Sequence, residues 1–277
     1  MLRSAAVNSP WLVNGAVCDR VPAGDRGLHY GQGLFETMRL SGGELPLWPR
    51  HRARLSRGAR TLGIALDEVQ VEDELARARA LWPSEGVVKL IITAGSGGEG
   101  YRADAGAAPT RVIGYRPVPE PRAPLRLQVC SHRLPCAPAL AGIKHLNRLD
   151  QVLAARELDP GCEGLLLDGS QRIVEVLSGN FFVKSAAGWR TPPLTGNGVR
   201  GVLRELLLDT VFPALGETLD EADMTLSELC AAEAAFACNA VRGIEPVARI
   251  EGWCNLDIGA VAPISAALHR LVPCFAD

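Results

Sequence analysis

Short apolar runs bounded by glycine and asparagine dominate the first 115 residues, a pattern that predicts strands joined by tight turns. Asn14-Gly15 and Gly42-Gly43 each lie between two such runs, and both dipeptides favour hairpin turns. Apolar residues at helical spacing follow twice before a last pair of strands. The predicted hairpins cover 11–18 and 34–48, the predicted helices 50–64 and 71–82, and the last two strands lie within 86–101 and 110–117.

The second part of the chain mixes strands and helices in the same way. The segment 145–157 predicts a helix that ends before Asp159-Pro160-Gly161. Its apolar face is expected to contain Leu146, Leu149, Val152 and Leu153. The predicted strands are 125–130, 163–168, 172–176 and 180–185 with a further strand-turn-strand at 234–250, and the second predicted helix is 201–212.

A proline-rich segment divides the chain into two predicted domains. The stretch "YRPVPEPRAP" holds four prolines in ten positions, so it is expected to be stiff and extended and to lie outside helices and central strands. We therefore predict a small N-terminal domain at 1–114, a linker at 115–124 and a larger domain at 125–277. Many hairpins mixed with helices favour an α+β fold over a doubly wound sheet.

Composition excludes several classes of protein. The chain has 277 residues, 47% hydrophobic and 22% charged, which is ordinary for a globular protein, and its formal net charge of −2 creates no field that attracts nucleic acid or an anionic membrane. No apolar run approaches the roughly 18 residues of a membrane span. The eight cysteines and five histidines are dispersed, with no CxxC pair. This spacing predicts a cytoplasmic protein with reduced thiols and no metal site.

The sequence "GSGGEG" at 95–100 matches the G-x-G-x-x-G pattern of dinucleotide-binding loops. A dinucleotide site needs a helix to begin at the loop, because the helix N-terminus holds the pyrophosphate. The following "YRADAGAAP" is too rich in glycine, proline and short residues for that helix. A plain hairpin loop and a loop that closes over an active site both stay open as interpretations.

The basic stretch "RHRARLSRGAR" raises nucleic-acid binding as an alternative. Its arginines spread around the predicted helix, and no aromatic residues lie among them to stack on bases. We expect a solvated helix, with Arg54 as the candidate for an arginine that points inward at an anion.

Lys144 and Glu175 are the candidates for chemistry. A desolvated lysine has a lowered pKa and forms a Schiff base with an aldehyde. Glu175 lies in the apolar "RIVEVLSGN" and needs a cationic partner, such as a protonated pyridine nitrogen. Glycines precede the predicted helix at 201–212, where backbone N–H groups of Gly201, Val202 and Leu203 are candidates to bind a phosphate.

Several motifs in one order extend this pattern over nearly the whole chain. The sequence resembles the fold-type IV pyridoxal-phosphate enzymes, the class IV aminotransferase family, which contains branched-chain and D-amino-acid aminotransferases and aminodeoxychorismate lyase. "GLFET", the "GSGGEGY" loop and "KHLNRL" are most similar to the lyase. The other matching motifs are "DRGLHYG", "RARL", "VEVLSGNFF", "GVRGVLR" and "CNAVRGIEPV".

The resemblance implies roles for individual residues. Lys144 matches the lysine that binds pyridoxal 5'-phosphate, and Glu175 matches the residue that pairs with the pyridine nitrogen. Arg54 matches the arginine that binds the phosphate, together with the N–H groups near Val202 and Leu203. The resemblance also places Asn180 near the ring and the turn Asn239-Ala240 near the phosphate. Candidates for the substrate side are Tyr30, Thr37, Glu99, Tyr101 and Arg148.

The resemblance further implies the fold and the assembly. The expected fold is that of a D-amino-acid aminotransferase, with a small α/β N-terminal domain and a larger domain built on a pseudo-barrel sheet. The expected assembly is a homodimer in which the loop 95–101 lies near the active site of the second copy.

Three positions depart from the family pattern on the substrate side. Glu99 stands where the loop commonly has arginine, Ala94 replaces another frequent arginine, and Gln32 replaces the aspartate of GDG.

The function that the resemblance implies is elimination of pyruvate from 4-amino-4-deoxychorismate, giving 4-aminobenzoate for folate synthesis. The alternatives are an aminotransferase acting on an amino acid and a catalytically silent homologue.

Overall fold

The computed structural model describes residues 11–104 and 106–276, so residues 1–10 of the predicted N-terminal domain lie outside it. The chain divides into two compact units between Val118 and Pro119, within the predicted linker. Tyr115 and Arg116, the first two linker residues, belong to the last strand of the N-terminal unit.

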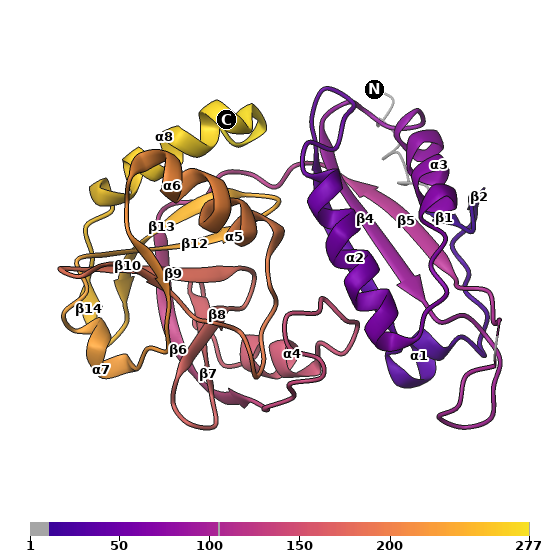
Figure 1. Cartoon of the computed structure of the whole chain (residues 1–277), viewed down its shortest axis with the longest axis horizontal. Coiled ribbons are helices and arrows are strands. Elements are labelled where there is room, and N and C mark those ends of the chain that lie inside the picture. The colour runs from indigo at the N-terminus through magenta and orange to yellow at the C-terminus, as the bar shows by residue number, and fades with distance from the viewer. Residues whose placement is uncertain (1–10, 105, 277) are drawn as a thin grey trace, which may run out of the picture. The chain divides into compact units, whose positions relative to one another are not determined.

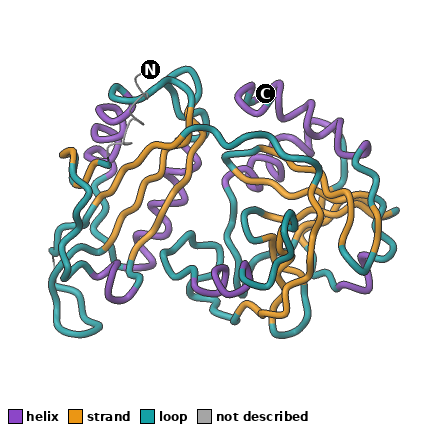
Figure 2. Tube along the Cα trace, turned by 180° about the vertical axis from the view of Figure 1, so that it is seen from behind, coloured by secondary structure: helices purple, strands orange, loops and turns teal. Residues whose placement is uncertain are grey.

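The N-terminal unit is an antiparallel sheet in the order β2-β1-β5-β4-β3. Helix α2 packs on β3 and α3 on β5, and both views show these helices on one face of the sheet (Figures 1 and 2). The strands are β1 (Leu12–Val13), β2 (Ala16–Val17), β3 (Gly33–Leu40), β4 (Gly86–Thr93) and β5 (Arg111–Arg116), and the helices are α1 (Arg26–Tyr30), α2 (Trp48–Leu62) and α3 (Glu68–Arg79).

Strand β3 shows how the sequence pattern positions a buried charge. Its side chains alternate, and Leu34, Met38 and Leu40 are buried. Glu36 has the same parity and is therefore buried with them, 1% exposed. A carboxylate in that position needs a cation, and Arg54 on α2 provides it.

The C-terminal unit is built on a nine-stranded sheet in the order β11-β10-β9-β12-β13-β6-β7-β8, with β14 paired to β13. Helices α5, α6 and α8 lie near β12 and β13 in Figure 1, and α5 contacts β12. The strands are β6 (Leu125–Leu134), β7 (Glu163–Asp168), β8 (Ile173–Val176), β9 (Asn180–Ser185), β10 (Gly188–Thr191), β11 (Leu219–Glu221), β12 (Ala234–Asn239), β13 (Gly243–Ile250) and β14 (Cys254–Asn255). The helices are α4 (Leu149–Ala155), α5 (Val202–Leu206), a π-helical turn (Leu207–Val211), α6 (Phe212–Leu215), α7 (Leu226–Leu229) and α8 (Ala262–Leu271), with short 3-10 turns at Gly259–Val261 and Pro273–Phe275.

The short link between β8 and β9 requires this sheet to curl. Only residues 177–179 separate the two strands, so their ends lie within about 14 Å of each other. In the sheet order they are five strand spacings apart, which in a flat sheet is about 24 Å. The sheet therefore bends into a partial barrel around a core that includes Phe181, Leu165 and Val247.

Most predicted elements are confirmed, including the hairpin turning at Asn14-Gly15, whose φ angles are 52° and 77°. The expected strand at 45–48 is wrong, because Pro46 and Leu47 form a turn that leads into α2 at Trp48, and the pairing after the glycines is limited to the Ser41–Glu44 bridge. Strands β10, β11 and β14 and helices α1, α7 and α8 were not predicted.

The helix expected at 145–157 is shorter, and its apolar face is not buried. It begins at Leu149 and ends at Ala155, before the predicted stop. Leu149, Val152 and Leu153 are 67%, 54% and 40% exposed. Apolar periodicity identified the helix correctly but did not identify what its face packs against.

Candidate active site

The segment that contains Lys144 is bound to a second loop of the same unit. It connects β6 to α4 and runs beside residues 195–201. The Gly142 N–H donates to the Gly198 carbonyl at 2.9 Å, and the Arg200 N–H donates to the Gly142 carbonyl at 3.2 Å. Gly142 adopts φ 78°, a left-handed conformation that favours glycine. Lys144, which is half-buried, therefore projects from a segment with a fixed backbone two residues away.

Glu175 binds that same loop. It lies in β8, is 5% exposed, and its Oε2 accepts the Val199 N–H at 2.9 Å. Burial raises the pKa of Glu175, and the Val199 N–H and the charges of Arg148 and Lys144 oppose this rise. Glu175 and Lys144 are thus held in one region by residues 198–200, as their predicted cooperation requires.

Asn180 completes the attachment of the loop. This first residue of β9 donates from Nδ2 to the Val199 carbonyl at 2.7 Å and accepts the Gly201 N–H on Oδ1 at 3.1 Å. The Gly201 N–H is therefore engaged within the chain, which differs from the expectation of a free donor there. Gly201 instead allows close approach, since a Cβ at this position would lie 2.1 Å from Asn180 Oδ1. Val202 and Leu203 open α5 immediately afterwards.

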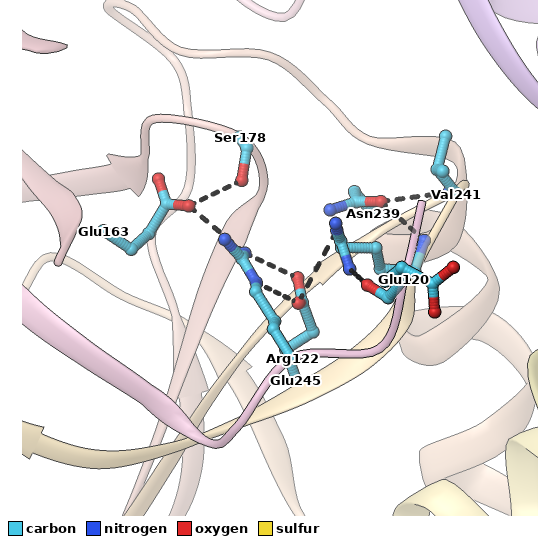
Figure 3. Close-up of polar contacts among 8 residues, drawn as sticks. Glu120, Arg122, Glu163, Ser178, Asn239, Val241 and Glu245 are labelled. Atoms are coloured by element: carbon cyan, nitrogen blue, oxygen red, sulfur yellow. Dashed lines mark hydrogen bonds and ion pairs between the residues drawn. The ribbon is translucent and has the colours of Figure 1, made fainter. Parts of the chain in front are cut away.

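The turn at Asn239-Ala240 lies beside Asn180, because β12 pairs with β9 at this end. Asn239 Oδ1 accepts the N–H groups of Val241 and Arg242 at 3.0 and 2.9 Å, and the first contact is drawn in Figure 3. Such a side-chain cap fixes the conformation of the turn. The C-terminal unit thus brings together Lys144, Glu175, Asn180, the start of α5 and this turn.

Arg54 lies in the N-terminal unit, on α2, where Glu36 holds it. Its Nε donates to Glu36 Oε1 at 2.9 Å and its Nη2 to Glu36 Oε2. His51 Nδ1 lies 2.6 Å from the same Oε2. Burial would raise the pKa of Glu36, but Arg54 and His51 outweigh it and lower that pKa to about 2. The buried guanidinium is therefore fixed in orientation, and its binding of a phosphate stays a prediction.

A buried arginine that the sequence analysis did not single out organises the glycine-rich loop. Arg26 is 4% exposed, and its Nε donates to Gln32 Oε1 at 2.6 Å. Its other nitrogens donate, at 2.9 to 3.3 Å, to the carbonyl oxygens of Gly97, Gly100, Tyr101 and Arg102. Gln32, one of the departures from the family pattern, thus helps to hold Arg26, and it also donates to the Leu62 carbonyl.

The loop presents its substrate-side candidates at the surface of the N-terminal unit. The rings of Tyr30 and Tyr101 are 5.5 Å apart, and Tyr101 is 89% exposed. Glu99 is exposed and forms a backbone bridge with Arg102. Thr37 is half-buried on β3.

Ala94 and Arg148 complete the set of positions singled out from the sequence. Ala94 is 5% exposed at the end of β4, where its N–H donates to the Gln32 carbonyl at 3.0 Å. Arg148 belongs to the C-terminal unit and precedes α4, with its Nε donating to the His145 carbonyl at 2.8 Å. Within 11–104 and 106–276, no group of three or more His, Cys, Asp or Glu is arranged to hold a metal ion. No helix in the described part of the chain is long and apolar enough to cross a membrane.

Comparison with known proteins gives the class to which this site belongs. The model of the class IV aminotransferase family matches residues 33–250, so the chain belongs to that family. An aminodeoxychorismate lyase of Vibrio harveyi is 32% identical over 245 residues, covering 86% of this chain and 90% of the relative. A putative branched-chain-amino-acid aminotransferase of Methanocaldococcus jannaschii is 27% identical over 84% of this chain and 83% of the relative.

Among solved structures, the 4-amino-4-deoxychorismate lyase of Pseudomonas aeruginosa has a TM-score of 0.88 and 38% identity, covering 94% of this chain and 98% of that one. The fold expected from the sequence is therefore confirmed.

The contact between Asn180 and Gly201 gives a stability test. Gly201→Ala should lower the free energy of unfolding by about 2 kcal/mol, since its Cβ collides with Asn180 Oδ1. The same substitution in an Asn180→Ala background should cost much less, because the colliding atom is gone. Urea denaturation of the four proteins measures this difference, and equal costs in both backgrounds would contradict the close approach.

The raised pKa of Glu175 gives a pH dependence of the apoprotein. Folding raises the pKa of this carboxyl above its ordinary value of 4.5. The folded protein therefore loses stability as the pH rises from 4.5 through the raised pKa. Apo Glu175→Gln should therefore melt at a higher temperature than the apo wild type near pH 7. This advantage should shrink as the pH falls toward about 4.5. A constant difference between the melting temperatures across this range would contradict burial as the dominant effect.

Proposed function

We propose that the chain is a pyridoxal-phosphate-dependent aminodeoxychorismate lyase, which releases pyruvate from 4-amino-4-deoxychorismate and leaves 4-aminobenzoate, a folate precursor. The observation that carries the proposal is the joint attachment of the Lys144 segment and buried Glu175 to the loop 198–200. Two relatives at 32% and 38% identity that bear this activity in their names support the choice of reaction.

The residues of the C-terminal unit fit the coenzyme. When bound, pyridoxal phosphate supplies an aldehyde for an amine and a pyridine ring that withdraws electrons. Lys144 provides the amine that would bond to the aldehyde, and Glu175 is a buried carboxylate that a ring N–H⁺ would stabilise. The phosphate is assigned to the N–H groups of Val202 and Leu203, to the turn Asn239-Ala240 and to Arg54.

Lys144 also acts as the base. It removes the proton from the amine-bearing carbon of the substrate, and the electrons of that bond drive expulsion of the enolpyruvyl group as its C–O bond breaks. The departing group takes up a proton and becomes pyruvate, and the six-membered ring becomes aromatic. Aromatisation makes the elimination strongly favourable, so the chain mainly has to orient the substrate and move one proton.

The substrate side is assigned to Arg148 and to residues of the N-terminal unit. Arg148 is a cation close enough to act on Glu175 and is suited to a substrate carboxylate. Tyr30, Thr37, Glu99 and Tyr101 are the remaining candidates. With Glu99 in place of the common arginine, the loop repels an anion instead of binding one, which moves carboxylate recognition toward Arg148.

An aminotransferase is the second candidate, supported by the 27% identical relative named as a putative branched-chain aminotransferase. It would use the same lysine but would return a proton to the coenzyme and release a keto acid. A dependence on a keto-acid acceptor distinguishes it from the lyase.

Incubation of the holoenzyme with aminodeoxychorismate tests the function. The wild type should release pyruvate when no keto-acid acceptor is added, and Lys144→Ala should lose the visible imine absorbance and slow pyruvate release by roughly a thousandfold or more. Lys184→Ala, which alters a half-buried lysine on β9, should keep both. Amino-group transfer that requires a keto acid, with no pyruvate from the substrate, would replace the lyase by the aminotransferase.

The proposal includes a cytoplasmic homodimer with the loop 95–101 of one copy near the active site of the other. All eight cysteines are free thiols, as in reducing compartments. The exposed apolar face of α4, formed by Leu149, Val152 and Leu153, supports self-association, because such a face is normally covered.

Charge on the α4 face should separate the two copies. Leu149→Glu with Val152→Glu should convert the dimer to a monomer in sedimentation velocity, because carboxylates would be buried at the contact. Leu81→Glu, at a leucine that is 56% exposed in the N-terminal unit, is the matched control and should leave the mass unchanged. A wild type that sediments as a monomer would refute the assembly.

A further inference from the structure

Arg122, a residue of the proline-rich linker, lies between two buried carboxylates of the C-terminal unit (Figure 3). Its Nε and Nη2 donate to Glu245 at 2.5 and 3.0 Å, and Nη2 also donates to Glu163 at 3.2 Å. The side chains of Glu163 and Glu245 are only 8% and 10% exposed. They lie on β7 and β13, the two neighbours of β6, which begins three residues after Arg122.

Glu163 connects Arg122 to the turn before Asn180. Ser178 Oγ donates to Glu163 Oε2 at 2.9 Å, and the next two residues of the turn are Gly179 and Asn180. Gly179 packs on the neighbouring strand so closely that a Cβ there would lie 2.5 Å from the Cys238 carbonyl oxygen. The turn therefore has little freedom to move once Ser178 is held.

Glu245 connects Arg122 to the turn after Asn239. Arg242, whose N–H is capped by Asn239, has its Nε 4.0 Å from Glu245 Oε1. Its Nη1 donates to the Glu120 carbonyl at 2.8 Å, so the linker also binds this turn directly. The two turns are adjacent, because the end of β12 pairs with the beginning of β9.

We propose that Arg122 is a positioning residue for the coenzyme: it sets the turns that carry Asn180 and Asn239-Ala240 without touching the coenzyme itself. This inference rests on the proposed function, which assigns the turn Asn239-Ala240 and the N–H groups of Val202 and Leu203 to the coenzyme phosphate. Asn180 holds Gly201, the residue directly before these N–H groups. No local sequence pattern indicates it, since Arg122 reaches residues 41 and 123 positions away in the chain.

The physical reason is charge balance around two buried carboxylates. Arg122 and Arg242 face Glu163 and Glu245, two charges of each sign. Without Arg122, Glu163 keeps the Ser178 hydroxyl and Glu245 keeps the more distant Arg242. Leaving a buried charge without its partner is costly, so the carboxylates would turn toward water and release both turns.

Titration of the apoprotein with pyridoxal phosphate, followed by visible imine absorbance, tests the inference. Arg122→Gln should raise the dissociation constant roughly tenfold, as loss of a few hydrogen bonds in a positioning contact does. Arg122→Lys keeps the charge but not the paired donors, so its dissociation constant should lie between those of the wild type and Arg122→Gln. Arg126→Gln is the matched control. It removes an arginine of β6 whose Nε donates to Glu251 at 2.7 Å, and the dissociation constant of the coenzyme should stay unchanged.

Ser178→Ala isolates one of the two connections. It should also raise the dissociation constant, and its effect should be smaller in the Arg122→Gln background, because the two residues act through one carboxylate.

Melting temperatures of the apoproteins separate positioning from general stability. A purely structural role would lower these temperatures and leave the dissociation constant unchanged, which would overturn the proposal.

The outcomes distinguish the inference from the function on which it rests. A wild type that forms no imine refutes the proposed function. A wild type that forms the imine, with Arg122→Gln and Ser178→Ala binding the coenzyme equally well, refutes only the role of Arg122. If Arg122→Gln does not fold, an unchanged dissociation constant for Ser178→Ala overturns the role.

Discussion

The hydrogen bond from the Val199 N–H to buried Glu175 is the contact on which the site depends. It fixes a loop that also binds the Lys144 segment through Gly142 and is held by Asn180. A buried carboxylate with a raised pKa is unfavourable for the empty fold, and the loop can be held this way only because glycines at 142, 198 and 201 permit the close approach. Stability of the apoprotein and the proposed pairing of Glu175 with a cationic ring nitrogen are thus opposed at one side chain.

Buried carboxylates recur as the means by which both units orient arginines. Glu36 holds Arg54 in the N-terminal unit, and Glu163 and Glu245 hold Arg122 in the C-terminal unit. Each carboxylate has a position in a strand whose alternation turns it inward, so the sheet determines where the cation must go. Arg26 differs, because it is held by carbonyl oxygens and a neutral amide.

The sequence was sufficient for most strands, because alternation is a local property, and residue type was enough to select Lys144 and Glu175 as candidates, whose chemistry stays a prediction. The beginning of α4 was placed too early: the His145 carbonyl accepts from the Arg148 side chain at 2.8 Å, and Arg148, at the N-cap of α4, provides no side-chain cap. The engagement of the Gly201 N–H by Asn180 and the roles of Arg26 and Arg122 depend on partners far away in the chain, which no local pattern encodes.

The curled sheet has two rims, and only one of them carries the residues assigned to the coenzyme. The turn at 186–187 joins β9 to β10 at the opposite rim, where Ala186 and Ala187 are exposed. The six residues of β9 separate this turn from Asn180 by about 20 Å. An affinity tag or a fluorophore inserted there would leave the catalytic rim untouched, which makes this small turn the natural place to attach a reporter of coenzyme exchange.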